Sequence, residues 1–213
     1  MKAQRLRALL TAVANRLALA EDELRDLDAA IGDGDLGITV RAASKAAIAT
    51  LAGMARSASP VEIIRCLASA IASANPSTFG ALVAGGMIAG AKAIDGTNEL
   101  GRNEILAFGR AAAQAIGTKG RSAVGDKTIL DALVPSLDAL EAAAPDNSSA
   151  LDLMIGAAKR GIDETKALPS KRGRAAWMGD RTKEHSDPGA TAYLRFLEAI
   201  RETTSSNDTG QAR

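Results

Sequence analysis

Apolar residues with helical spacing recur along almost the whole chain of 213 residues. In the first such stretch, one side of a helix would carry Leu6, Leu9, Leu10, Val13 and Leu17. No stretch alternates apolar and polar residues in the way that a half-exposed strand does. The apolar residues are mainly small or aliphatic, and only 2% of the chain is aromatic, which favours closely packed helices over a sheet. We therefore predict an all-α fold with roughly seven to nine helices.

Capping signals and prolines set the expected limits of the later helices. Ser59-Pro60-Val61-Glu62 combines an N-cap serine, a first-turn proline and a capping-box glutamate, and Asn75-Pro76 should end the helix that it opens. Pro135 lies inside another helical pattern, where we expect a kink or a break. Cys66 is expected in the core. Further helices are expected over about 82–94, 104–116, 128–143 and 149–168, and from Asp187-Pro188 onward.

The domain organisation is expected to be simple. We predict one domain over residues 1–202, followed by a flexible tail over 203–213, where polar residues dominate. The net charge of +1 implies no broad attraction to nucleic acid or to a membrane. A single cysteine excludes an internal disulfide, and no segment has the length of a membrane span or the clean apolar run of a leader peptide. A cytoplasmic protein is expected.

Three aspartates and three glycines share the ten residues from Asp28 to Gly37. Carboxylates this close repel one another unless a cation lies among them, and oxygen ligands are those that Mg²⁺ prefers. On a continuous helix Asp28 and Asp33 would point about 140° apart, so a glycine-rich loop is needed to bring them together. We therefore predict a divalent cation bound by Asp28, Asp33 and Asp35. A solvated acidic loop is the alternative.

Two other motifs fit this stretch only in part. Gly32-Asp33-Gly34-Asp35-Leu36-Gly37 has the spacing of the dinucleotide-binding fingerprint, but helices are expected on both sides where that motif needs a strand before it. Counting twelve positions from any of the three aspartates leads to no glutamate, so a calcium-binding EF-hand loop is not expected either.

A third near-match lies over residues 120–128, which resemble a P-loop with one residue too many. Asp126 stands between Gly125 and Lys127, which are adjacent in a true P-loop, and the preceding segment is helical. A glycine-flanked turn that opens a helix remains, and its free N–H groups could hold an anion. Lys127 is accordingly a candidate for stabilising a phosphate.

Four segments, in this order along the chain, resemble the nucleotide-binding L subunit, or C-terminal domain, of dihydroxyacetone kinases, the DhaL-type family. The resemblance covers about residues 3–200. It implies a barrel of eight antiparallel helices whose loops at one end bind ADP or ATP through two Mg²⁺ ions. The segments are Asp28-Ala29-Ala30-Ile31-Gly32-Asp33-Gly34-Asp35, Ser77-Thr78-Phe79-Gly80, Gly125-Asp126-Lys127-Thr128-Ile129-Leu130-Asp131-Ala132-Leu133, and Gly173-Arg174-Ala175-Ala176-Trp177-Met178-Gly179-Asp180-Arg181 running on to His185-Ser186-Asp187-Pro188-Gly189-Ala190.

The resemblance also assigns roles to residues of this chain. It makes Asp28, Asp33 and Asp35 the metal ligands, and it places the acceptor sugar on a separate K-type subunit, so that this chain would be half of an enzyme. Arg174 offers a planar fork for a phosphate, and transfer would be metal-assisted without a certain catalytic side chain. The residues expected to line the nucleotide are Leu36, Gly37, Ile38, Thr39, Ser77, Thr78, Gly120, Ile129, Arg174, Asp187, Pro188 and Gly189.

Two positions depart from the pattern of the family. Leu36 stands where members that take phosphate from the phosphotransferase system usually have histidine, and Pro76-Ser77-Thr78-Phe79-Gly80 replaces the usual Gly-x-Ser-Gly. The donor therefore stays open between ATP and a phosphotransferase-system protein. The acceptor stays open between dihydroxyacetone and another small ketose such as a tetrulose. Trp177, the only tryptophan, could stack on adenine or pack at the mouth of the barrel.

The expected partners are a K-type substrate-binding subunit and a second copy of the chain in a homodimer, with no nucleic acid and no membrane. Two other functions remain open. One is a nucleotide-sensing regulatory module without transfer activity, and the other is a nucleotide domain like that of fatty-acid kinases.

Overall fold

The computed structural model describes residues 1–144 and 149–210, except for the side chains of 206–210. Within these residues the chain forms nine α-helices and two 3₁₀-helices, and its only extended pairing is an isolated bridge between Lys2 and Glu99. The prediction of an all-α fold is confirmed. The α-helices are α1 (Ala3–Leu17), α2 (Glu21–Ile31), α3 (Leu36–Gly53), α4 (Pro60–Ala74), α5 (Thr78–Ala93), α6 (Arg102–Gly120), α7 (Leu130–Ala142), α8 (Ala150–Lys166) and α9 (Pro188–Gly210), and the 3₁₀-helices are η1 (Ala18–Ala20) and η2 (Arg174–Thr182).

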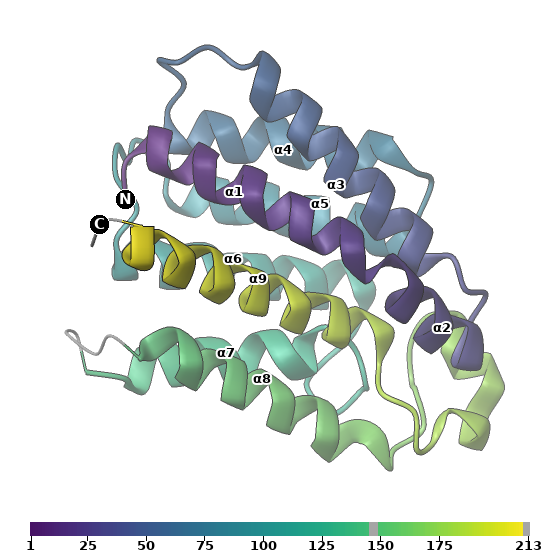
Figure 1. The fold of residues 1–213 in the computed structure, drawn as a ribbon. Helices are drawn as coiled ribbons and strands as arrows, with labels where there is room; N and C mark the ends of the chain where they lie inside the picture. Colours follow the sequence, from purple (N-terminus) through teal and green to yellow (C-terminus); the bar gives the residue numbers. More distant parts are fainter. Residues whose placement is uncertain (145–148, 211–213) are drawn as a thin grey trace.

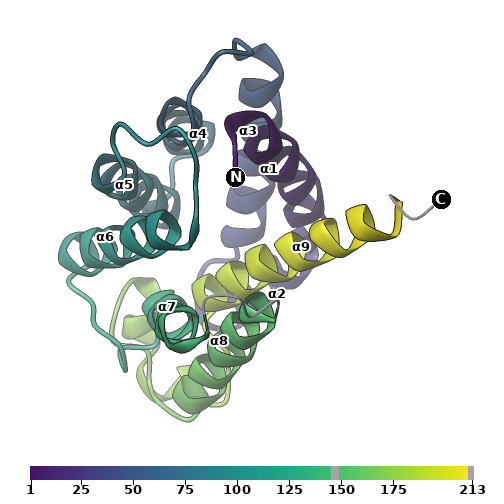
Figure 2. The ribbon, with the colours of Figure 1, turned by 90° about the vertical axis from the view of Figure 1, so that its left-hand side faces the viewer.

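The α-helices other than α2 pack around a closed ring, which Figure 1 shows from the side. Each helix from α3 to α8 packs against the next one in the chain, α9 packs against α1, and α1 packs against α3. Figure 2 shows this ring from one end, with α4, α5 and α6 on one side and α1 and α9 on the other. The ninth helix, α2, lies at the end of the ring where α1 ends and α3 begins. The barrel of eight antiparallel helices implied by the resemblance is thus present, with α2 added at one end.

The capping signals position α4 as predicted. The Ser59 hydroxyl accepts a hydrogen bond from the Glu62 N–H, and the Glu62 carboxylate accepts one from the Ser59 N–H. The core face of α4 consists of Ile63, Ile64 and Leu67. Cys66, which was expected in the core, is exposed. That prediction was wrong because Cys66 lies about 110° around the helix from the centre of the apolar face.

Pro135 does not break its helix, contrary to one of the two expected outcomes. It lies inside α7, where its ring removes the N–H that would have bonded to the Asp131 carbonyl one turn earlier. That carbonyl faces Gly161 of α8, where a Cβ atom would lie only 1.8 Å from the carbonyl oxygen. The missing side chain at Gly161 lets α7 and α8 approach closely at this point.

The core beneath one end of the barrel joins the consecutive helices α2 and α3 to the distant helix α9. Buried Leu24 of α2, Leu36 and Val40 of α3, and Ala192 of α9 form one apolar cluster. This cluster fixes the start of α3 and the start of α9 against α2. The loops between these helices are therefore held in defined positions relative to one another.

The last helix, α9, continues to Gly210, so residues 203–210 of the predicted tail, 203–213, belong to this helix. Its last three residues lie outside those described, and the flexibility of the tail stays a prediction. No helix in the described part of the chain has the length and apolar character needed to cross a bilayer.

Candidate metal and nucleotide site

The three aspartates of the sequence motif converge in space. Asp28 lies in the last turn of α2, and Asp33 and Asp35 lie in the short connection to α3; residues 28–37 are called the acidic loop below. Each aspartate offers one carboxylate oxygen, and these atoms all lie within 4.8 Å of one another. The turn needs its glycines, because Gly34 has a φ of +76° and a Cβ atom at Gly32 would lie 2.4 Å from a carboxylate oxygen of Asp28.

The electrostatics of the acidic loop suit a bound cation. Burial and the nearby charge of Asp28 raise the pKa of Asp35 above its usual value. Asp28 also accepts a hydrogen bond from the Leu36 N–H at 3.1 Å, which orients its carboxylate at the start of α3. Three converging carboxylates without a lysine or arginine inside the loop form the all-oxygen donor set that a hard divalent ion prefers. The residues present therefore fit a magnesium ion.

A cationic side chain from a distant part of the sequence meets the acidic loop. Arg174, at the start of η2, forms an ion pair with Asp33, and its guanidinium also lies 3.5 Å from Asp35. About three fifths of its side chain is exposed, so Arg174 can reach either the carboxylates or a ligand above them. The predicted phosphate contact of Arg174 is thus placed directly beside the predicted metal ligands.

The connection from α8 to α9, residues 167–187, carries Arg174 and is called the strap below. Its basic side chains Lys171 and Arg172 form ion pairs with Asp126, at 3.3 and 2.9 Å. Burial alone would raise the pKa of Asp126, but the hydrogen bonds from Arg172 and from the Ala123 N–H hold the pKa below its usual value. The strap is therefore fastened to the loop that precedes α7.

Lys127 is the strongest anchor of the strap. Only 1% of this residue is exposed, and its ammonium group donates to the carbonyl oxygens of Lys166, Leu168 and Thr182 at 2.9, 2.9 and 2.6 Å. An ammonium group has three donors, and all of them are used. The structure thus corrects the prediction that Lys127 stabilises a phosphate, and the site is built without it.

The rest of the P-loop-like motif is also occupied by internal bonds. The Asp131 carboxylate accepts hydrogen bonds from the backbone N–H groups of Gly125 and Thr128. Residues 125–131, called the clamp segment below, therefore tie the start of α7 to the strap. The sequence shows the neighbouring charges of Asp126 and Lys127, but nothing in it indicates that their partners lie about 40 residues further on.

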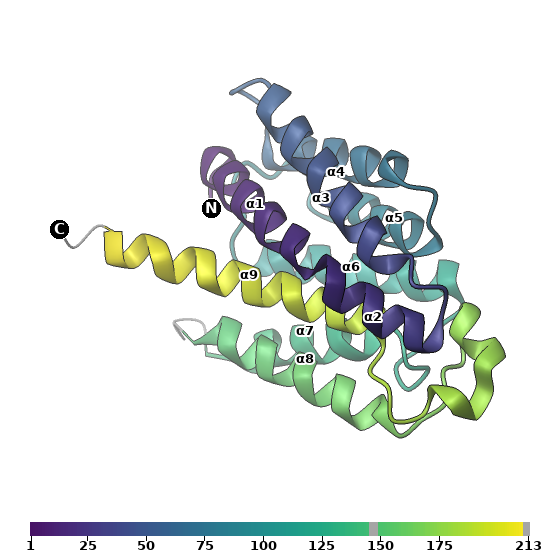
Figure 3. The same ribbon diagram turned by 45° about the vertical axis from the view of Figure 1, so that its right-hand side comes forward.

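The residues predicted to line the nucleotide gather at the same end of the barrel (Figure 3). Leu36, Gly37, Ile38 and Thr39 begin α3, Ser77 and Thr78 begin α5, Gly120 ends α6, Ile129 precedes α7, and Asp187, Pro188 and Gly189 begin α9. Four helix N-termini, those of α3, α5, α7 and α9, thus open toward this end. Unpaired N–H groups and the positive ends of helix dipoles favour anions such as phosphates.

Direct contacts connect the separate parts of this end. The Asn75 side chain donates to the Thr39 hydroxyl at 2.9 Å, which links α3 to the loop before α5. A Cβ atom at Gly189 would lie 2.9 Å from the Phe79 ring, so the start of α9 rests on the start of α5. Phe79 belongs to the stretch that departs from the family pattern, and it is packed against a predicted nucleotide residue.

Asp187 caps α9, as its position before a proline predicted. Its carboxylate accepts a hydrogen bond from the Ala190 N–H at 2.7 Å. Burial, together with the smaller effects of the neighbouring charges of Asp131 and Asp28, raises the pKa of Asp187 to about 7, although the hydrogen bond from the Ala190 N–H and the charge of Lys127 oppose this rise. Charges of both the acidic loop and the clamp segment therefore affect the pKa of Asp187, which the sequence did not indicate.

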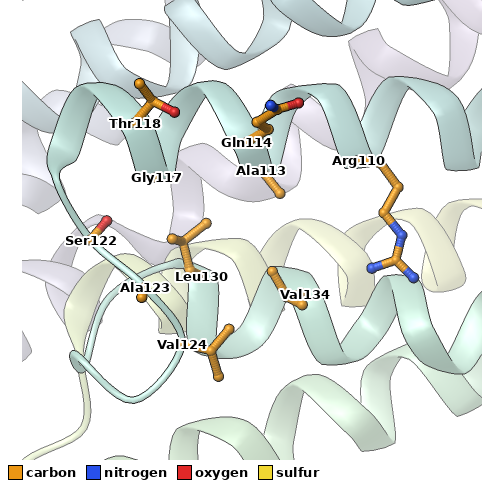
Figure 4. Close-up of a pocket in the computed structure, with 10 residues that line it drawn as sticks. All are labelled: Arg110, Ala113, Gln114, Gly117, Thr118, Ser122, Ala123, Val124, Leu130 and Val134. Carbon is orange, nitrogen blue, oxygen red and sulfur yellow. The ribbon is translucent and has the colours of Figure 1, made fainter.

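An open groove of about 530 Å³ lies between α6 and α7 beside the clamp segment. Figure 4 shows Thr118, Ser122, Val124 and Leu130 at one end of it and Arg110 at the other. The groove adjoins Gly120 and Ile129 in the chain, two of the residues predicted to line the nucleotide. Sequence patterns gave no sign of it, because it depends on the spacing between two helices.

Comparisons with known proteins agree on one family. A family model described as the DAK2 domain matches residues 30–202. The ADP-binding subunit DhaL of the PEP-dependent dihydroxyacetone kinase of Escherichia coli K12 is 26% identical over 90% of this chain and 92% of its own length. Human triokinase/FMN cyclase is 29% identical over 95% of this chain, and L-erythrulose 1-kinase of Mycolicibacterium smegmatis is 31% identical over 85% of it.

The structural comparison supports the same relationship. The crystal structure of the dihydroxyacetone kinase from C. freundii in complex with AMP-PNP and Mg²⁺ matches with a TM-score of 0.73 and 26% identity, over 95% of this chain and 34% of that chain. The chain spans most of the bacterial subunit but only 36% and 32% of the human and mycobacterial relatives. It therefore corresponds to one subunit or one domain of such kinases.

Proposed function

This chain belongs to the DAK2 domain family of DhaL-type proteins, and on that premise we propose that it is the nucleotide-binding subunit of a small-ketose kinase. It binds ADP or ATP together with Mg²⁺ at the end of the barrel formed by the acidic loop and the starts of α3, α5, α7 and α9. The observation that carries this proposal is the convergence of the oxygens of Asp28, Asp33 and Asp35 beside four helix N-termini.

The residues of the site have distinct parts in phosphoryl transfer. Asp28, Asp33 and Asp35 would hold the Mg²⁺ ions, two of which the resemblance implies, and the bound metal would neutralise phosphate charge. Free N–H groups at the helix starts would hold the phosphate oxygens in place. Transfer of this kind depends on positioning and charge neutralisation more than on covalent help from the protein.

Arg174 can pair either with the carboxylates of the acidic loop or with a phosphate group of the nucleotide. Without a cation its guanidinium neutralises Asp33 and Asp35. If those carboxylates held a metal ion, it would balance their charge, and the planar guanidinium would be free to form paired hydrogen bonds with phosphate oxygens. Arg174 would then stabilise the charge that develops on the phosphoryl group during transfer.

The acceptor is proposed to be a small ketose carried by a separate K-type subunit. The relatives include kinases of dihydroxyacetone and of erythrulose, so both a triose and a tetrulose are tested as acceptors. The donor, ATP or a phosphotransferase-system protein, and the homodimer stay predictions.

Titration calorimetry of ADP in the presence of Mg²⁺ tests the proposed site. We expect Asp33→Asn to weaken the binding of Mg·ADP by about a hundredfold or more, because a charged metal ligand is lost. The matched control is Asp152→Asn in the first turn of α8, an exposed aspartate that pairs with Arg201 at the other end of the barrel. Equal affinity in the Asp33 variant and the wild type would refute the proposed metal site.

An assay of transfer separates this function from the regulatory alternative. The chain, the K-type subunit of the same organism, Mg·ATP and either dihydroxyacetone or erythrulose are mixed, and the sugar phosphate is measured. Product formation that depends on both proteins supports the kinase. If Mg·ADP binds tightly but no product forms, either with ATP or with a phosphotransferase-system protein as the donor, the result favours a nucleotide-sensing module.

A further inference from the structure

Trp177 is the only tryptophan of the chain, and 88% of it is exposed. It therefore does not pack at the mouth of the barrel, which was one of its two expected positions. Trp177 follows Arg174 by three residues in η2, and residues three apart lie on the same face of a 3₁₀-helix. The indole thus lies one turn, about 6 Å along the helix, from the arginine that contacts the acidic loop.

The segment that presents this indole is held firmly. Thr182, at the end of η2, is completely buried; its hydroxyl accepts from the Ser170 N–H at 2.8 Å and donates to the Gly179 carbonyl at 2.7 Å. The Thr182 carbonyl in turn accepts from Lys127. An exposed aromatic side chain on an anchored segment loses little conformational freedom when it binds, and such residues dominate the binding energy of many protein interfaces.

The surroundings of Trp177 are basic. Residues 171–183 contain five lysine and arginine side chains and only one acidic side chain, Asp180. Arg174 is the cation nearest to the acidic loop, and Arg181 follows Trp177 by four residues, close to the Met178 sulfur. Four of these five cations are paired with carboxylates of the fold, and Arg181 forms no ion pair within the described residues. The positive charge of Arg181 beside the indole fits a partner whose matching face is acidic.

We propose that Trp177 and the basic residues of the strap dock the subunit that carries the phosphoryl acceptor, with the indole inserted into a pocket that has an acidic rim. This inference rests on the proposed function. An acceptor atom must come within about 3–3.5 Å of the phosphoryl group that it attacks, so the acceptor-carrying subunit has to cover this end of the barrel. Figure 3 shows the strap at the outer margin of that end, beside α2.

The single tryptophan makes the interaction directly observable. Because the chain has no other indole, fluorescence excited at a wavelength that Tyr193 does not absorb reports the environment of Trp177 alone. The chain is titrated first with Mg·ADP and then with the K-type subunit of the same organism, in a variant of that subunit without tryptophan. We expect emission typical of a solvated indole with and without Mg·ADP, and a shift to shorter wavelength with reduced acrylamide quenching when the subunit is added.

A substitution measures what the contact contributes. We expect Trp177→Ala to weaken binding of the K-type subunit at least tenfold, with Trp177→Phe in between, because truncation of a buried aromatic anchor commonly costs that much. The affinity for Mg·ADP should change less than twofold. The control is Leu19→Ala in η1, since Leu19 is 84% exposed but lies in another connection, and it should leave both affinities unchanged.

Two results would overturn this proposal. One is a Trp177→Ala variant that binds the K-type subunit with the affinity of the wild type. The other is a shift in emission that saturates with Mg·ADP alone together with weaker nucleotide binding by Trp177→Ala, which would assign the indole to the nucleotide site. In either case wild-type binding of Mg·ADP still supports the proposed function, whereas its absence would refute that function separately.

Discussion

The acidic loop and the clamp segment look alike in the sequence, but they meet opposite conditions in the fold. Both combine glycines with charged side chains at the start of a helix. In the acidic loop the side chains of Asp33 and Asp35 are 41% and 42% exposed, and their cationic partner, Arg174, is 59% exposed. In the clamp segment Lys127 and Asp131 are almost completely buried and bonded to backbone groups of the chain itself.

This difference shows how a charged motif can be interpreted. A buried charge whose hydrogen bonds are all made inside the protein stabilises the fold and leaves nothing for a ligand. Converging like charges at the surface destabilise the fold slightly and gain energy when a cation binds. The clamp segment therefore positions the strap, whereas the carboxylates of the acidic loop remain available to bind a cation.

The largest expected effect comes from the clamp segment. Lys127→Met removes the donor shared by three carbonyl groups, and we expect the free energy of unfolding to fall by about 3 kcal/mol or more, because buried polar groups lose their partner. Urea unfolding without Mg²⁺ or nucleotide measures this loss. Lys119→Met, which removes an exposed ammonium group at the end of α6, is the control and should change stability by less than about 0.5 kcal/mol. Unchanged stability of the Lys127 variant would contradict the comparison.

A second effect concerns Asp187, which lies between the two regions. Its pKa of about 7 in the folded chain exceeds its usual value of 3.8, so the folded state keeps a proton that the unfolded state releases. The stabilisation is complete below pH 4 and is lost as the pH rises toward and through 7, by about 2 kcal/mol between pH 5 and 7.

Urea unfolding of the wild type and of Asp187→Asn across this pH range isolates the contribution of that carboxyl group. Asparagine keeps the N-cap but does not titrate, so the difference between the two proteins should change with pH. Parallel pH profiles would show that the carboxyl group of Asp187 titrates normally in the fold.

The smallest expected effect is a gain in the free energy of unfolding, opposite in sign to the loss expected for Lys127→Met. Asp35→Asn removes one of the crowded carboxylates, whose raised pKa reflects burial and the charge of Asp28. Because the side chain is 42% exposed and screened by solvent, we expect a gain of only about 0.5 kcal/mol in the metal-free free energy of unfolding. Thermal shifts should then show a smaller stabilisation by Mg·ADP than in the wild type. A loss of metal-free stability would mean that the pair with Arg174 outweighs the repulsion.

Local sequence signals predicted the parts of this protein that depend on neighbouring residues. The capping box before α4, the N-cap at Asp187 and the loop that joins α2 to α3 all follow from residues a few positions apart. The same reasoning failed where the outcome depended on distant partners. Cys66 is near the apolar face of its helix but outside it, and the helix around Pro135 continues because Gly161 of α8 accommodates the freed carbonyl.

The sequence by itself determined that the chain is helical, that three aspartates lie in one glycine-rich turn, and that the family resemblance extends over nearly its whole length. Hydrophobic periodicity, capping and charge repulsion act over a few residues, so they can be read from the printed chain. Only the tertiary structure decided that Lys127 is an internal anchor, that Arg174 reaches the acidic loop, and that Trp177 is left uncovered. These outcomes depend on which backbone and side-chain groups the closed ring of helices brings together across more than 35 residues of chain, and burial then decides whether each charge serves the fold or a ligand.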